Sequence, residues 1–391
     1  MTLHPPRAPR RVRRTVTVDD VRAAARRRVP RAVFDFVDGA AENERTLARA
    51  RRGFDEVTFL PDVLRDVGEV DTLTRIGQCG SRLPIAIGPT GYTGLFHPDG
   101  ELAMARAAHT EGIPYTLSTM GTRGISEIRH ALPDASLFFQ LYFWRDPART
   151  AELIAEARDQ RVDALVVTVD MPVGGARLRD LRRGLRMPPR ITLPLLIDGA
   201  LHPSWAWGYV RRPPQFVSLA PGGSRSISEV ADLMFDPSAT LASLEMVRSL
   251  WPGRLIVKGV LTARAAAEVV SAGADEVLVS NHGGRQLDRC PTSLECLQAV
   301  RDRLGPDVPV HLDGGVRDGA DVAAALALGA DSAWLGRAPL YGLMAGGEAG
   351  AAHVLRMIGH QLVATMRLLG ARTLPELVGH ATLGGTLREH P

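Results

Sequence analysis

The sequence predicts an α/β protein built as one (β/α)8 barrel, and two observations carry that prediction. From residue 84 onward, eight short apolar runs of strand character are separated, in most cases, by Ala/Leu/Arg/Glu-rich stretches of helical character. Eight such units within 391 residues fit a single barrel. Polar residues also follow all eight runs, as expected at the C-terminal face of a barrel. A doubly wound sheet would instead gather its chemistry at one switch point.

The apolar runs predict the eight barrel strands in order. They span residues 84–88, 115–118, 137–142, 164–169, 255–258, 276–280, 308–312 and 332–335. Helices are expected between them, for example over residues 147–157, 263–272 and 319–328. Before the barrel, residues 17–28 predict a helix with Thr17 as its N-cap and Pro30 just past its end. After the barrel, residues 351–369 predict a helix that ends at Gly370.

Two segments lie outside this repeat. Residues 1–16 are rich in Pro and Arg and are expected to form a disordered basic tail, leaving residues 17–385 as one domain. Residues 188–239 interrupt the pattern between the fourth and fifth strands, and an insertion of that length is usually functional. Its aromatic and basic side chains suit either a lid over the site or a membrane-docking element. These side chains are Trp205, Trp207, Tyr209, Arg211 and Arg212.

Composition narrows the setting. The three cysteines Cys79, Cys290 and Cys296 are odd in number and lack metal-type spacing, which indicates reduced thiols in the cytoplasm. No apolar run is long enough to span a membrane, and the first residues do not resemble a secretory signal. The net charge of +4 permits contact with an anionic surface, so a peripheral position at the inner face of the membrane stays open. No nucleic-acid partner and no metal site are expected, because no His/Asp/Glu cluster has ligand spacing.

The stretch from Ser280 to Asp288, SNHGGRQLD, carries most of the functional signal. It follows an apolar run and places His282 and Arg285 beside paired glycines, where a strand ends and a loop begins. Glycine lets the backbone approach a ligand closely. A histidine beside an arginine suits removal of a proton from an anionic substrate, because the arginine holds the anion while the histidine takes the proton.

This nonapeptide resembles the active-site signature of the FMN-dependent α-hydroxy-acid oxidase and dehydrogenase family, which includes glycolate oxidase, lactate dehydrogenase and mandelate dehydrogenase. The resemblance extends over roughly residues 18 to 380 and implies FMN as the cofactor and a homotetramer as the assembly. Lys258 supports it independently, because it is the one lysine among 47 Lys and Arg residues. A guanidinium cannot replace a compact ammonium beside a ring. The family has a lysine there, beside the flavin N1–C2 carbonyl edge.

Two glycine-rich turns indicate where a phosphate binds. Asp313-Gly314-Gly315-Val316-Arg317 follows the seventh run, and Gly336-Arg337 follows the eighth. Barrels bind phosphate in the loops after these strands, through backbone N–H groups and a cation. Two ordinary turns with solvated arginines are the alternative. The resemblance implies that the aspartate contacts the ribityl chain and that the arginines hold the FMN phosphate.

Polar residues at the other strand ends match family positions that contact the flavin. They are Pro89, Thr90, Gly91, Ser118, Gln140, Thr168 and Ser280, together with Lys258. Without the resemblance, each could equally be a hydrogen-bonded loop residue. A nicotinamide cofactor is disfavoured, because no Gly-x-Gly-x-x-Gly fingerprint with a following acid is evident.

The resemblance also assigns the catalytic roles. His282 is the expected base, Asp170 orients it, and Arg177 and Arg285 clamp the substrate carboxylate, while Tyr142 hydrogen-bonds the substrate oxygen. The alternatives are a turn-capping role for Asp170 and a solvated Arg177.

The chain departs from the family at residue 36. The opening motif of the family normally supplies a tyrosine that touches the substrate carboxylate, and Phe36 stands there instead. A lost hydrogen bond to a charged group costs about 1.5–3 kcal/mol, so weaker acid binding is expected unless Tyr92 or the ligand compensates. Phe36→Tyr is expected to tighten that binding.

Other positions favour a bulky or aryl acid over glycolate. Gly91 replaces the alanine of glycolate oxidase and is expected to make room beside the flavin. Met120 replaces a tryptophan, and residues 195–205 resemble a segment of bacterial mandelate dehydrogenases.

The sequence therefore predicts oxidation of an L- or S-2-hydroxy acid, such as mandelate or lactate, to the 2-oxo acid. Electrons would pass to O2, to a quinone or to a protein acceptor. Three rivals remain: an FMN barrel such as the type 2 isopentenyl diphosphate isomerase, a family member acting on a carrier-bound or peptide-derived substrate, and a flavin-binding scaffold without turnover.

Overall fold

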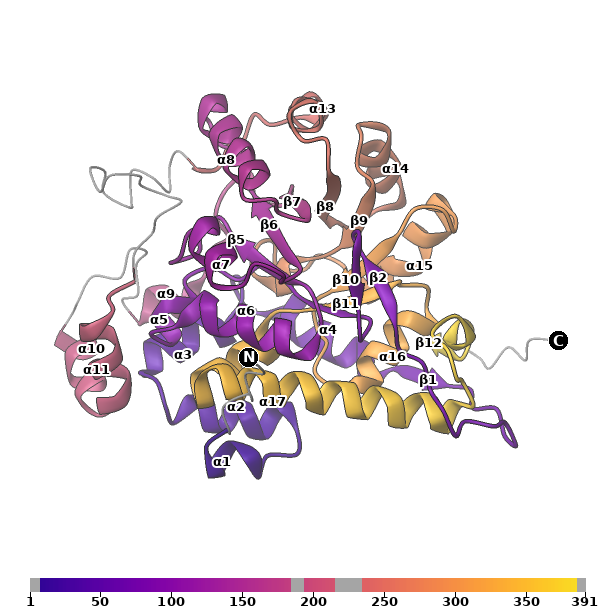
Figure 1. The fold of residues 1–391 in the computed structure, drawn as a ribbon, viewed down its shortest axis with the longest axis horizontal. Helices are drawn as coiled ribbons and strands as arrows, with labels where there is room; N and C mark the ends of the chain where they lie inside the picture. Colours follow the sequence, from indigo (N-terminus) through magenta and orange to yellow (C-terminus); the bar gives the residue numbers. More distant parts are fainter. Residues whose placement is uncertain (1–7, 184–192, 215–233, 385–391) are drawn as a thin grey trace.

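Eight parallel strands close into a barrel in the computed structural model, which describes residues 8–183, 193–214 and 234–384 (Figure 1). The strands run in chain order, and β11 pairs with β4 to close the ring through Ala333↔Ile85, Trp334↔Ala86 and Leu335↔Ile87. The barrel strands are β4 Ile85–Ile87, β5 Tyr115–Ser118, β6 Leu137–Leu141, β7 Ala164–Thr168, β8 Arg254–Val260, β9 Glu276–Val279, β10 Val310–Asp313 and β11 Ser332–Leu335. All eight predicted strands are confirmed.

Helices surround the barrel, and those predicted after strands β6, β8 and β10 are confirmed. The surrounding helices are α5 Thr93–Phe96, α6 Gly100–Glu111, α7 Ile125–Ala131, α8 Pro147–Asp159, α13 Leu241–Leu250, α14 Ala263–Ser271, α15 Ser293–Leu304, α16 Gly319–Ala327 and α17 Arg337–Leu369. α17 is longer than predicted and breaks at Gly346 and Gly347. It ends at Gly370, whose left-handed backbone (φ 79°) confirms the predicted stop. The helix runs along the lower edge of Figure 1.

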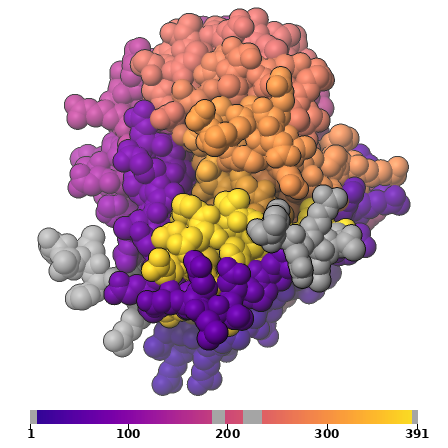
Figure 2. Space-filling view, turned by 90° about the vertical axis from the view of Figure 1, so that its right-hand side faces the viewer, coloured from indigo at the N-terminus to yellow at the C-terminus, as the bar shows by residue number. Residues whose placement is uncertain are grey.

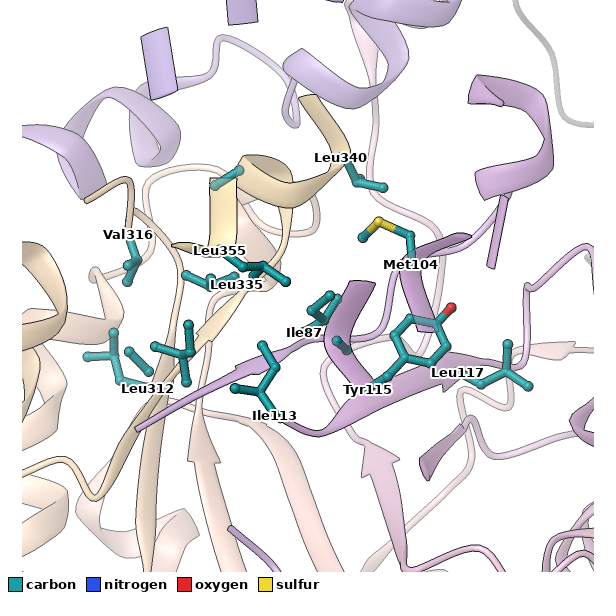
Figure 3. Close-up of a cluster of buried hydrophobic side chains, with 14 of the residues drawn as sticks. Ile87, Met104, Ile113, Tyr115, Leu117, Leu312, Val316, Leu335, Leu340 and Leu355 are labelled. Carbon is teal, nitrogen blue, oxygen red and sulfur yellow. The ribbon is translucent and has the colours of Figure 1, made fainter. Parts of the chain in front are cut away.

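The barrel interior is packed and closed at one end. Alternate strand residues, among them Phe138, Ile256 and Trp334, point inward and are buried. Ile76 from the β2–β3 hairpin (Thr74–Ile76 and Cys79–Ser81) joins this inner core. A larger core lies between the strands and the helices, where Tyr115 and Ile87 meet Met104 of α6 and Leu355 of α17 (Figure 3). With the hairpin at the N-terminal ends of the strands, the C-terminal ends stay available for chemistry.

Four helices precede the barrel: α1 Arg10–Arg13, α2 Val18–Arg26, α3 Arg31–Asp38 and α4 Arg45–Asp55. The predicted Thr17 cap of α2 is confirmed, because Asp20 N–H donates to Thr17 Oγ1 over 3.1 Å and Thr17 N–H donates back to Asp20 over 3.0 Å. The expectation of a disordered tail is wrong for its described part. Val12 of α1 is 1% exposed and α1 packs against α17, so an apolar contact orders this segment.

Two helices lie in the described part of the insertion, where no helix was predicted from the sequence. α10 (Leu193–Ala200) and α11 (Pro203–Arg211) extend away from the barrel at the left of Figure 1. α11 is fixed to the loop around α5, since Trp205 Nε1 donates to the carbonyl of Leu95 over 2.8 Å. Arg212 pairs with Asp99 over 2.5 Å. None of the helices in the described ranges is both long and apolar enough to cross a membrane.

The last described strand pairs with a strand that precedes the barrel in the sequence. β1 (Val57–Phe59) pairs antiparallel with β12 (Ala381–Leu383). In Figure 2 the yellow C-terminal surface accordingly lies against purple surface from the first third of the chain. The remaining described elements are α9 Leu178–Arg182 and the short 3-10 turns η1 His282–Gly284 and η2 Pro375–Leu377.

Candidate active site

A cavity that is partly open to solvent lies at the C-terminal ends of the barrel strands. Most of the residues singled out from the sequence line it. They are Phe36, Pro89, Thr90, Gly91, Ser118, Tyr142, Arg177, Lys258, His282, Arg285, Asp313, Gly314, Gly315, Val316, Arg317, Gly336 and Arg337. Segments far apart in sequence therefore converge on one space, because parallel strands bring all their C-terminal ends to one face.

Four expected site residues stand behind this lining and support it. Asp170 contacts His282, Ser280 accepts a hydrogen bond from Lys258, and the side chain of Gln140 accepts one from Ser118. Thr168 ends β7 directly opposite Lys258 in the strand register.

His282 begins the short turn η1 after β9 and is held by Asp170. Its Nδ1 lies 3.0 Å from Asp170 Oδ1 and 3.2 Å from Oδ2. Burial lowers the pKa of His282 below its ordinary value, and Lys258 adds to this effect, although the Asp170 carboxylate opposes it. Burial alone would raise the pKa of Asp170, but His282 and Lys258 outweigh it and lower that pKa. A neutral imidazole that donates from Nδ1 to Asp170 leaves Nε2 as a proton acceptor.

Two arginines contact the ring of Phe36 in the same cavity. The Arg285 guanidinium lies 4.8 Å from the centre of the Phe36 ring and that of Arg177 lies 5.8 Å from it. Arg285 also donates to the carbonyls of Phe36 (2.6 Å) and Gly39 (3.0 Å). Among the described residues, the buried Arg177 Nε has no hydrogen-bond partner.

The charge of these arginines is poorly compensated. Burial, together with Arg177 and Arg337, lowers the pKa of Arg285, yet a guanidinium keeps its proton in proteins. The buried carboxyl of Asp180 on α9 is one source of negative charge facing them, and burial raises its pKa to about 6. Concentrated positive charge in a largely buried space favours an anionic ligand.

Lys258 occupies the floor of the cavity. Its Nζ donates to Ser280 Oγ over 2.8 Å and lies 3.2 Å from Asp313 Oδ2. Ser280 Oγ also accepts from the backbone N–H of His282 over 3.0 Å. The lone lysine, the base and the aspartate of the predicted phosphate motif therefore form one connected group.

The two predicted phosphate-binding arginines differ in their contacts. Arg337 donates to the carbonyls of Val37 (2.8 Å), Gly283 (2.9 Å) and Gly39 (2.7 Å), so it ties α3 to the His282 turn. Three of the five N–H groups of a guanidinium are thus used, and two remain. Arg317 stacks over the ring of Tyr341 at 5.7 Å. Sequence reasoning missed this structural role of Arg337.

The lining fits a large polar cofactor. Among the described residues, the buried atoms Thr90 Oγ1, Gln140 Nε2, Thr168 Oγ1 and Asp313 Oδ1 have no hydrogen-bond partner. Thr90 and Asp313 line the cavity, and Gln140 and Thr168 stand directly behind that lining. Buried polar groups are normally paired, so unpaired atoms on the cavity wall and just behind it are consistent with a bound ligand that pairs them. All four belong to residues that the resemblance assigns to FMN. A Cβ added to Gly336 would meet nothing within 4 Å, so this turn leaves open space beside Arg337.

The structure gives a different reason for glycine at position 91 than the expected space beside the flavin. A Cβ at this position would lie 2.7 Å from Met120 Cβ, closer than side chains tolerate. The backbone N–H of Tyr92 donates to the carbonyl of Met120 over 2.9 Å, which draws the two loops together. Close approach of these loops therefore requires glycine, whatever space it leaves for a ligand.

The sequence assigned Trp334 no role and named Tyr92 only as a residue that could compensate for Phe36. Trp334 forms part of the cavity floor and belongs to the inner barrel core. Its inward position follows from strand alternation in β11, which could have identified it. Tyr92 also lines the cavity, but only the fold brings its ring beside Phe36.

Comparison with known proteins agrees with this geometry. The family model described as FMN-dependent dehydrogenase matches residues 25–382. A putative L-lactate dehydrogenase of Mycobacterium tuberculosis is 44% identical over 371 residues, which cover 94% of this chain and 89% of the relative. Among solved structures, the monotopic membrane protein (S)-mandelate dehydrogenase is 35% identical with a TM-score of 0.90, over 95% of this chain and all of that one. A mandelate oxidase is 33% identical with a TM-score of 0.81 at the same coverage.

The chain belongs to the FMN-dependent dehydrogenase family, the hydroxy-acid oxidase and dehydrogenase family that its sequence resembles. It is an oxidoreductase with FMN as its cofactor.

Proposed function

We propose that this enzyme oxidises an L- or S-2-hydroxy acid with a bulky or aryl side chain to the corresponding 2-oxo acid. The observation that carries the proposal is the His282–Asp170 pair, 3.0 Å apart, in the cavity that also contains Arg177 and Arg285. A base beside two arginines matches the needs of a substrate that carries a carboxylate next to the carbon to be oxidised.

Each side chain has a defined task in this proposal. Arg177 and Arg285 hold the substrate carboxylate, and the Tyr142 hydroxyl hydrogen-bonds the substrate oxygen. His282 takes the proton, from the α-carbon or from the hydroxyl. Asp170 keeps the imidazole in the accepting tautomer and stabilises the imidazolium that forms.

FMN would be held by the lining residues that follow the other barrel strands. Thr90, Gln140 and Thr168 have the unpaired polar atoms for its ring, while Asp313 suits the ribityl chain. The phosphate would be held by Arg317, by the remaining donors of Arg337 and by the backbone N–H groups of the two glycine-rich turns. Those turns contribute Gly314, Gly315, Val316 and Gly336 to the cavity lining. When bound, FMN accepts the two electrons of the oxidation. Lys258 places a positive charge in the same space and stabilises negative charge there.

Several features support a bulky side chain over glycolate. Met120 lines the cavity with a flexible thioether, and Phe235 packs edge-on against Tyr142 at 5.3 Å. Relatives of this chain carry the names lactate dehydrogenase, mandelate dehydrogenase and mandelate oxidase. Molecular oxygen, a quinone or a protein would take the electrons onward, and the family resemblance suggests a homotetramer.

The α10–α11 pair supports peripheral membrane contact. Its exposed apolar side chains include Ile197 (59% exposed), Leu201 (75%), Trp207 (60%) and Val210 (74%). The Arg211 guanidinium lies 4.7 Å from the centre of the Trp207 ring. An apolar surface bordered by arginine is suited to the interface of an anionic membrane.

Steady-state kinetics of two variants test the proposed chemistry. We expect Arg285→Met to raise KM for lactate and mandelate steeply, because a clamping charge is lost. We expect His282→Gln to lower kcat by at least roughly a hundredfold with a smaller change in KM. Near wild-type kcat in His282→Gln would refute the assignment of the base.

A further inference from the structure

Tyr92 occupies an unusual backbone position in the cavity. It caps the N-terminus of α5 with φ 60° and ψ 27°, a left-handed conformation that a bulky residue rarely adopts. Of the non-glycine residues with positive φ among those described, Tyr92 and His282 are the two that line the cavity. Backbone strain of this kind persists where surrounding structure enforces it, often in functional sites.

The Tyr92 side chain lies beside the proposed carboxylate clamp. Its ring is 5% exposed and packs edge-on against Phe36, with ring centres 5.8 Å apart. Burial raises the pKa of Tyr92 to about 12, while the charges of Arg177 and Arg285 oppose that rise. Tyr92 in turn contributes to the raised pKa of Tyr142. The phenol is thus a neutral donor at physiological pH, within electrostatic range of both arginines and the second tyrosine.

We propose that the Tyr92 hydroxyl donates a hydrogen bond to the substrate carboxylate held by Arg177 and Arg285. Phe36, whose ring centre lies 4.8 Å and 5.8 Å from the two guanidinium groups, has no hydroxyl and cannot supply that bond. Tyr92 is therefore a specificity-determining residue that favours a free carboxylate over a neutral ester or amide. This inference rests on the proposed function, because it assumes that a carboxylate binds between the two arginines.

The hydroxyl that hydrogen-bonds the substrate carboxylate therefore comes from a different part of the chain than the resemblance to the family predicts. In this chain the donor comes from the loop after β4 and not from helix α3. Tyr142 remains available for the reacting oxygen of the substrate, since the two phenols enter the cavity from separate strands. A carrier-bound substrate without a free carboxylate would have no use for the Tyr92 hydroxyl.

Ligand binding to the oxidised, FMN-loaded protein tests the proposal without turnover. The probes are benzoylformate and its neutral amide, and the readout is the dissociation constant from calorimetry or from the change in flavin absorbance. Tyr92→Phe is expected to weaken benzoylformate binding roughly 10- to 100-fold, as for a lost hydrogen bond to a charged group, and to change amide binding less than about threefold. Adding Phe36→Tyr to Tyr92→Phe should recover part of the loss, because a hydroxyl returns near both arginines.

Two outcomes would overturn the proposal. Benzoylformate binding that stays within about twofold of wild type in Tyr92→Phe would exclude the hydrogen bond. Equal weakening of the acid and the amide, at unchanged FMN content, would assign Tyr92 a packing role only. The proposed function is judged separately, by whether 2-hydroxy acids reduce the flavin of the wild-type protein, so the two ideas can fail independently.

Discussion

Replacing Asp170 by asparagine tests the electrostatic core of the proposed mechanism. Asp170 Oδ1 lies 3.0 Å from His282 Nδ1, so the carboxylate faces the imidazolium that forms when the base takes its proton. Opposite charges with centres about 4 Å apart attract by roughly 4 kcal/mol at an effective dielectric constant of about 20. The amide keeps the shape but removes the charge. Allowing for partial solvent compensation, we expect a loss of about 2–4 kcal/mol in the transition state, a drop of roughly 30- to 1,000-fold in kcat/KM.

The pH profile of the same variant tests the effect of Asp170 on the pKa of His282 independently of the rate. Burial lowers the pKa of His282 below its ordinary 6.5, whereas Asp170 acts to raise it. In the proposed mechanism the neutral imidazole is the active form, so activity should fall as the pH drops through that pKa. The acid limb of wild-type kcat/KM should therefore lie below 6.5. Without the Asp170 charge the pKa of His282 falls further, which moves the limb to lower pH by at least about one unit.

A matched control is present in the barrel interior. Glu276 Oε2 lies 2.7 Å from His311 Nε2 in a second buried histidine–carboxylate pair that does not line the cavity. Glu276→Gln should leave the acid limb where it is. A loss of less than about threefold in kcat/KM for Asp170→Asn would contradict the proposed role of the carboxylate. So would an acid limb that stays in place or moves to higher pH.

Three further outcomes follow from the structure. Lys258→Met should lower the melting temperature and the FMN content, because it leaves the Asp313 carboxylate, 3.2 Å from Lys258 Nζ, without its partner at a cost of about 3–5 kcal/mol. Adding Asp313→Asn should restore stability, and a double variant that stays destabilised would contradict the pairing. Gly91→Ala should lower the free energy of unfolding, measured by denaturant titration, by about 1–3 kcal/mol, because its Cβ would lie 2.7 Å from Met120 Cβ. Adding Met120→Gly should recover the stability, and a Gly91→Ala variant as stable as wild type would refute the clash. Trp207→Ser should reduce sedimentation with anionic vesicles while leaving kcat for a soluble acid unchanged; undiminished vesicle binding would exclude α11 as the contact.

Local patterns were sufficient for the barrel and for most of the site. Strand periodicity located all eight strands, because each buried strand is a short apolar run between turn residues. Site residues such as Lys258 and Asp313 could be anticipated because parallel strands in a closed barrel present their C-terminal ends together. Those positions depend on chain order and on local chemistry, which a sequence carries directly.

Contacts between distant segments could not be anticipated in the same way. Val12 is buried where α1 packs against α17, and nothing in the Pro- and Arg-rich sequence around Val12 indicates that contact. Gly91 owes its identity to the Met120 loop, which only the folded barrel brings within contact. Arg337 reaches three carbonyls on other segments, and Tyr92 packs on Phe36 from a different element. Such relations arise from tertiary packing and not from periodicity.

The visible spectrum of the purified protein, recorded without oxygen before and after racemic mandelate is added, tests the central claim most directly. The account predicts an oxidised flavin spectrum that bleaches in wild type and bleaches far more slowly in His282→Gln. Readmitting air then reports whether oxygen serves as the acceptor. A flavin that stays oxidised in wild type with mandelate and also with lactate would contradict the proposed oxidation of a free 2-hydroxy acid.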